Sequence, residues 1–224
     1  MLMDWSAAFL SLRLASWTCL ILLPLGVMIA RALAWRRFRF KGVVEALIAL
    51  PLVLPPTVLG YYVLVALGGA SPIGRAWQVI TGHQLVFTFG GLLIASLFVN
   101  IPFAVQPMQR AFEAVSYDIR EAAWVSGMSR MATFLRVELP LAWPGVLSAI
   151  ALTFAHTMGE FGVVLMVGGS IPGETRTIAI AIYDRAQAFD QAAAGFMSLV
   201  LLLFSVAAIA LVHALTGRIG RRHA

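Results

Sequence analysis

QRAFEAVSYDIREAAWVSGMSRMATFLRVELP, residues 109–140, is a charged segment that lies between two long apolar stretches. It is too polar to cross a lipid bilayer, yet its helix signals are regularly spaced. Ser116 and Ser129 each stand where a side-chain oxygen caps the start of a helix, and Gly127 stands between them, where a left-handed residue ends one. Pro140 opens the next apolar stretch at a first-turn position, where its missing N–H costs nothing. The segment therefore predicts two short helices joined at a glycine corner, followed at Pro140 by a separate membrane helix.

The rest of the chain is dominated by apolar residues. Of its 224 residues, 61% are hydrophobic and only 12% are charged, and the mean hydropathy is +0.91. A soluble domain carries about 25% charged residues. A helix needs about 20 residues to cross the hydrocarbon core of a bilayer. The stretches that meet this length are 12–34, 44–68, 85–108, 141–168 and 194–216. We therefore expect an all-α polytopic membrane protein with five or six transmembrane helices, in a single domain over residues 1–224.

The basic residues predict the orientation of these helices. Arg and Lys concentrate in cytoplasmic loops, and five crossings place twelve of the 16 Arg and Lys residues on one side. These twelve are Arg31, Arg36, Arg37, Arg39, Lys41, Arg110, Arg120, Arg130, Arg136, Arg218, Arg221 and Arg222. The N-terminus is then outside, whereas segment 109–140 and the C-terminus are cytoplasmic. The net charge of +6 is expected to attract anionic lipid headgroups rather than nucleic acid.

Segment 109–140 also carries a spaced motif. Its order is Glu-Ala-Ala, three residues, Gly, nine residues, Val, one residue, Leu-Pro. This pattern resembles the EAA loop of ABC importer permeases and departs from it only where Val replaces Ile. The resemblance implies the fold of a type I importer permease, with a loop that enters a cleft of a cytoplasmic ATPase. The coupling residues would be Glu121, Ala122, Ala123, Gly127, Val137, Leu139 and Pro140.

Two other blocks narrow the resemblance to one subfamily. LPLVLPPTVLGYY at 50–62 is similar to a signature of molybdate permeases. GEFG at 159–162 and IPGETRT at 171–177 resemble further segments of the same subfamily. The implied substrate is a tetrahedral oxyanion, with molybdate preferred. Sulfate permeases share the EAA loop, so a sulfate or tungstate permease remains an alternative.

The energy source must lie on another chain if transport is active. No P-loop of the form GxxxxGK[ST] occurs, so this chain does not by itself cradle nucleotide phosphates. The resemblance implies two ATPase subunits that bind ATP and Mg²⁺, a second copy of this chain, and an external oxyanion-binding protein. The chain itself would be no enzyme and would hold no cofactor or metal. The alternatives of another class are a carrier or channel that acts alone, and a purely structural membrane subunit.

Polar residues and prolines inside the apolar stretches are candidates for the pathway or a gate. The prolines of the second stretch must interrupt a helix, and such a break needs protein or water around it. In the fourth stretch three polar residues are predicted to share one helical face. The alternative roles are helix–helix contacts and a structural pair. The candidates are Pro55, Pro56, Thr57, Asn100, Gln106, Thr153, His156 and Glu160.

Overall fold

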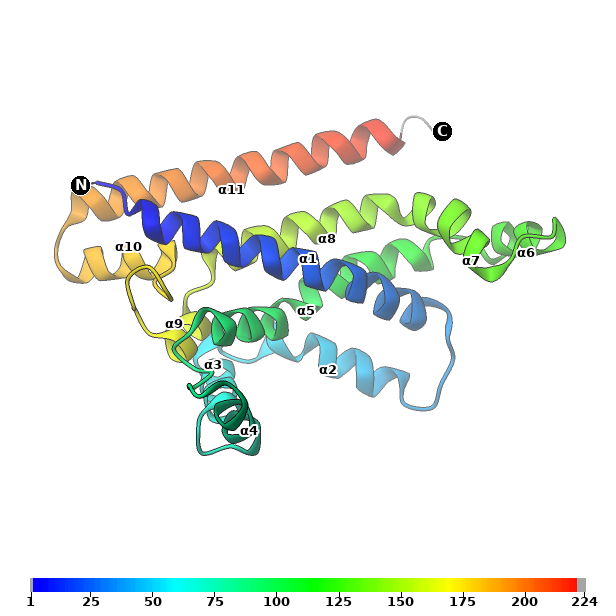
Figure 1. Cartoon of the computed structure of the whole chain (residues 1–224). Coiled ribbons are helices and arrows are strands. Elements are labelled where there is room, and N and C mark those ends of the chain that lie inside the picture. Colours follow the sequence, from blue (N-terminus) through cyan, green and yellow to red (C-terminus); the bar gives the residue numbers. More distant parts are fainter. Residues whose placement is uncertain (1, 221–224) are drawn as a thin grey trace.

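Three long helices form the centre of the molecule. A computed structural model describes residues 2–220, and every regular element within them is a helix (Figure 1). Helices α1 (Trp5–Trp35), α5 (Phe89–Glu113) and α8 (Leu139–Gly159) pack against one another. Residues 111 and 145 show how closely α5 and α8 approach, because a Cβ on Gly145 would collide with the side chain of Ala111. Small residues permit such close packing between membrane helices, and the all-helical fold is confirmed.

The described residues contain four helices that are long and apolar enough to cross a membrane, or five if one bent pair counts as a single span. Besides α1 and α5 these are α11 (Gln191–Gly220) and a continuous helix over Arg130–Gly159 that includes α8. Helix α1 begins at Trp5, earlier than expected, because the Asp4 carboxylate accepts the Ala7 N–H at 3.0 Å and caps it. Arg221 and Arg222 of the predicted cytoplasmic tail lie outside the described residues.

The second apolar stretch is two helices rather than one straight span. Helices α2 (Lys41–Val53) and α3 (Pro56–Leu67) are bent by 112° at the residues between them. Leu54 and Pro55 both adopt extended backbone, because each precedes a proline whose ring disfavours the helical region for the residue before it. Helix α3 then packs against α9 (Gly162–Gly168), where Gly60 leaves room for Met166.

The helix that contains α8 differs at both ends from the sequence expectation. No separate helix starts at Pro140, because α7 (Arg130–Thr133) passes into α8 through a π-helical turn, η1 (Phe134–Glu138). The Leu139 N–H reaches the Phe134 carbonyl across this wider turn. At the other end, α8 ends at Gly159, not near residue 168, because Glu160 turns to extended backbone before α9 begins.

The remaining short helices lie at the two ends of the bundle. Helix α6 (Tyr117–Val125) and α7 project from the end opposite the N-terminus, and α4 (Pro72–Thr81) follows α3 on the side of the molecule (Figure 1). Helix α10 (Ile178–Gln187) packs between α1, α8 and α11 near the N-terminus. The predicted segment 109–140 is therefore a projection fixed to the ends of α5 and α8.

Candidate functional site

The glycine corner of the projection has the local structure that its sequence predicts. The Ser116 hydroxyl oxygen accepts the Ile119 N–H at 3.4 Å and caps α6. The helix ends at Val125, and Gly127, two residues later, takes a φ of +86°, a left-handed conformation that favours glycine. The Met128 N–H then returns to the Ala123 carbonyl at 3.0 Å, as in a Schellman motif. The Ser129 hydroxyl caps α7 at once, so the corner holds α6 and α7 at a fixed angle.

A buried ion triad fixes α6 to the membrane helices. Glu138, on η1, is fully buried, and its two carboxylate oxygens accept hydrogen bonds from two arginines on other helices. Arg31 Nε of α1 lies 2.7 Å from one oxygen, and Arg120 Nε of α6 lies 3.0 Å from the other. A buried carboxylate requires such partners, since an unpaired buried charge is strongly destabilising. The triad therefore joins α6, η1 and α1 at one point.

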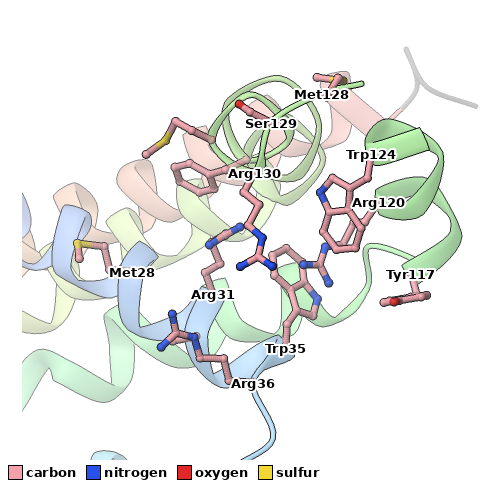
Figure 2. Close-up of a pocket in the computed structure, with 13 residues that line it drawn as sticks. Met28, Arg31, Trp35, Arg36, Tyr117, Arg120, Trp124, Met128, Ser129 and Arg130 are labelled. Carbon is pink, nitrogen blue, oxygen red and sulfur yellow. The ribbon is translucent and has the colours of Figure 1, made fainter. Parts of the chain in front are cut away.

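An aromatic stack supports the triad. The Arg120 guanidinium lies 3.7 Å from the centre of the Trp35 ring, and Trp35 packs edge-on against Phe112 of α5. Trp124 flanks Arg120 at 5.0 Å on the side of α6 (Figure 2). Stacking of this kind exploits the planar guanidinium, which lysine does not have. The sequence analysis missed these contacts because Arg31, Arg120 and Glu138 are far apart in the chain.

The predicted coupling residues are divided between an open and a packed surface. Glu121 and Ala122 are exposed on α6, whereas Ala123 is buried against the corner. Val137 and Leu139 are half-buried beneath, where Leu139 packs against the core of α1, α5 and α8, and Pro140 is exposed. Beside the two open residues, Val125 is 90% exposed, and Tyr117 and Ile119 are also exposed. Helix α6 thus presents apolar side chains, beside the exposed carboxylates of Asp118 and Glu121, that nothing among the described residues covers.

A second polar group lies near the other end of α8. His156 Nδ1 lies 3.1 Å from the Asn100 side-chain oxygen, and Nε2 lies 3.6 Å from the Glu160 carboxylate. The imidazole stacks on Phe103 with ring centres 4.1 Å apart. The expected contact between His156 and Glu160 is thus present, and the structure adds Asn100 to it, which the sequence did not predict. The predicted shared helical face is wrong for Glu160, which follows the end of α8 and caps α9 by accepting the Val163 N–H.

The other pathway candidates differ in burial. Thr153 is buried, and its hydroxyl has no hydrogen-bond partner among the described residues. Gln106 is half-buried on α5. Pro55, Pro56 and Thr57 are exposed at the α2–α3 bend. A Cβ on Gly162 would approach the Pro56 Cβ to 2.7 Å, so the bend packs against the start of α9, two residues after Glu160.

The IPGETRT block forms a compact loop. The Thr175 hydroxyl oxygen accepts the Ile171 N–H at 3.0 Å, and Gly173 takes a φ of +79°. Just after the loop, the Ile178 N–H donates to the buried Ser11 hydroxyl of α1 at 2.8 Å. Part of this signature therefore specifies a turn that leads directly to the attachment to α1.

Comparisons with known proteins place the chain in one family. Residues 23–222 match the family model described as binding-protein-dependent transport system inner membrane component. The molybdenum transport system permease protein ModB of Azotobacter vinelandii is 49% identical over 202 residues, which cover 90% of this chain and 89% of that protein. The protein of the same name from Escherichia coli K12 is 36% identical, covering 82% and 80%. The probable sulfate transport system permease protein cysT of Chlorella vulgaris is 30% identical, covering 93% and 78%.

Solved structures with the same fold include two ABC importers. A bacterial ABC transporter involved in the import of the acidic polysaccharide alginate superimposes with a TM-score of 0.77 at 15% identity, covering 96% of this chain and 79% of that one. An inward-facing form of the MetNI methionine ABC transporter gives 0.70 at 16% identity, covering 96% and 93%. At these identities the likeness shows the fold alone. Fold and sequence agree, and the chain belongs to the family of binding-protein-dependent transport system inner membrane components.

Proposed function

We propose that this chain is the permease subunit of an ATP-driven importer of molybdate. Molybdate is proposed as the substrate because the chain is 49% identical to the molybdenum permease of Azotobacter vinelandii over 90% of its length. Sulfate permeases match at 30%, so sulfate is the second candidate and tungstate the chemical analogue to test beside it. The complex would contain two copies of this chain, two ATPase subunits that bind ATP and Mg²⁺, and an external oxyanion-binding protein.

The exposed apolar surface of α6 is the proposed contact with the ATPase. Val125, Ile119 and Tyr117 are exposed on a helix whose orientation the corner and the ion triad already determine. An amphipathic helix that inserts into a groove of a partner is a common mode of recognition. This assignment places α6 and the C-terminus in the cytoplasm and the N-terminus outside. It rests on the EAA pattern and on the distribution of arginine.

A displacement of α6 has two routes into the membrane. One passes through Arg120 and Glu138 to Arg31 on α1. The other passes along the unbroken helix from Arg130 to Gly159, which carries His156 about 27 Å from Glu138, at 1.5 Å per residue. The polar group of Asn100, His156 and Glu160 is therefore connected to the projection through the helix that carries His156. We assign this group, with Thr153, to the pathway or its gate.

The decisive experiment is ATP hydrolysis by the complex reconstituted in liposomes. The permease, its ATPase and its binding protein would be combined, and molybdate, tungstate or sulfate added on the side of the binding protein. Stimulation by molybdate but not by sulfate supports the proposed function. Stimulation by sulfate alone rejects the substrate and keeps the mechanism. Flux of molybdate through this chain without ATP or partner chains would reject the importer and support the carrier or channel.

A further inference from the structure

A basic cavity opens between the end of α1 and the α6–α7 corner. Its volume is about 1200 Å³, and Figure 2 shows arginines from all three helices around it. Four guanidinium groups line the cavity, those of Arg31, Arg36, Arg120 and Arg130. No carboxylate is among the lining residues that the structure describes.

The charge of this cavity is not neutralised. Glu138 is the one carboxylate paired with a lining arginine in the described part of the chain, and it is buried behind Arg31 and Arg120. Both arginines bind it through Nε, so their terminal amino groups stay available for a second acceptor. Four arginines and one carboxylate leave an excess of three positive charges. Guanidinium groups bind phosphate through paired hydrogen bonds, so a phosphate group fits the cavity chemically.

An apolar groove continues from the basic cavity along α1 and α8. The two share Met28 and Phe134, and the groove has a volume of about 460 Å³. Apolar residues line all of it, among them Val27 and Ile150, and Trp143 closes one side. Both helices belong to the candidate spans, so the groove runs along segments that are long and apolar enough to cross the membrane.

We propose that the basic cavity and the apolar groove together bind one anionic phospholipid. The phosphate would occupy the cavity, and an acyl chain would lie in the groove. The charge excess favours an anionic headgroup, and the continuity of the cavity with an apolar groove favours a lipid over a free anion. A free oxyanion or an acidic protein segment would use the cavity alone. Such a lipid would bridge α1 to the α6–α7 corner beside the ion triad, and so stabilise the projection. Its assignment to the cytoplasmic leaflet rests on the proposed orientation.

The test is lipid binding to the purified full-length chain in a neutral detergent, measured by native mass spectrometry. Phosphatidylglycerol is the probe, phosphatidylcholine the zwitterionic control, and glycerol phosphate the free headgroup. We expect phosphatidylglycerol to bind more tightly than phosphatidylcholine. Replacing Arg36 and Arg130 by Gln should weaken that binding by about fivefold for each arginine removed. Arg37→Gln is the matched control, because Arg37 is exposed in the same loop and does not line the cavity.

The groove is tested separately on α1. Val27→Trp fills it without a change of charge and should weaken binding of phosphatidylglycerol, whereas Ile29→Trp, outside the groove, should not. Equal binding by the Arg36→Gln/Arg130→Gln variant and the native chain would overturn the proposal. Competition by glycerol phosphate as strong as that by the whole lipid would also overturn it, because the cavity would then be a site for a free anion. The proposal would also be overturned if groove residues of two copies of this chain could be cross-linked to each other and the cross-linked pair no longer bound lipid. None of these readouts requires transport, so their failure is distinct from failure of the proposed function.

Discussion

Glu138→Gln is the substitution that probes the buried triad most directly. The amide keeps the size of the side chain but removes the charge that faces two guanidinium groups. The amide oxygen can accept from only one of the two charged guanidinium groups, and the amide NH₂ must face the other arginine. Arg31 is 34% exposed and turns to water, whereas Arg120 is only 11% exposed and cannot do so easily.

The expected loss follows from these contacts. Each hydrogen bond to a charged group contributes about 1.5–3 kcal/mol, and one of the two is lost while the other is weakened, so the substitution should cost about 2–4 kcal/mol of unfolding free energy. The measurement is denaturant unfolding of the purified chain in detergent. In the reconstituted complex, α6 should also lose its link to α1, so less uptake should accompany each ATP hydrolysed.

A surface ion pair supplies the control. Glu113 pairs with Arg110 at 3.1 Å, but the Arg110 side chain is 83% exposed. Glu113 also accepts a hydrogen bond from Gln109 Nε2 at 2.9 Å, which the amide oxygen of Glu113→Gln can keep. Such a pair contributes about 0–1 kcal/mol, so Glu113→Gln should change the unfolding midpoint little. If Glu138→Gln unfolded at the same midpoint as Glu113→Gln, the triad would not stabilise the projection and the reasoning would be refuted.

Three further changes test single features. Gly127→Val should reduce uptake per ATP hydrolysed, because a β-branched residue is strained at a φ of +86°. Gly127→Asn should have a smaller effect, since Asn tolerates this conformation better, and normal transport by the valine variant would show that the corner is not needed. Gly145→Ala should lower the unfolding free energy by about 1–3 kcal/mol, because the added Cβ would collide with α5. Gly195→Ala should not lower it, because Gly195 has open space around it, and equal unfolding midpoints for the two variants would contradict the close packing of α5 and α8. Glu160→Ala should lower the unfolding free energy by about 1 kcal/mol more than Glu160→Gln, because the amide of Gln keeps an oxygen that can cap α9. Denaturant unfolding of the two variants measures this difference.

The parts of the molecule that were predicted correctly depend on nearby residues. Ser116, Gly127 and Ser129 determine the corner through capping and a left-handed backbone, which are effects within a few residues. The long apolar helices follow in the same way from hydropathy. The EAA spacing identified the projection for the same reason, since it is a pattern in the linear sequence.

The parts that were missed depend on contacts between distant segments. The prolines at 51, 55 and 56 indicated a break, but the bend of 112° depends on how α3 packs against α9. Glu138 stands at an unspecified position of the EAA pattern, and only the folded structure brings Arg31 to it. Glu160 was placed on the helix of His156 because the spacing fits, but it caps the next helix instead.

The π turn at Phe134–Glu138 has a consequence for how α6 and α8 move together. A π turn holds one residue more than the α-helical turn it replaces. The segment between the projection and α8 therefore contains one residue more than a continuous α-helix would need. If the π turn became an ordinary α-helical turn, α7 would rotate relative to α8 by about 100° and move along the helix axis by about 1.5 Å. The Glu138 carboxylate would then leave its two arginines. The ion triad therefore stabilises the π turn in the arrangement seen here.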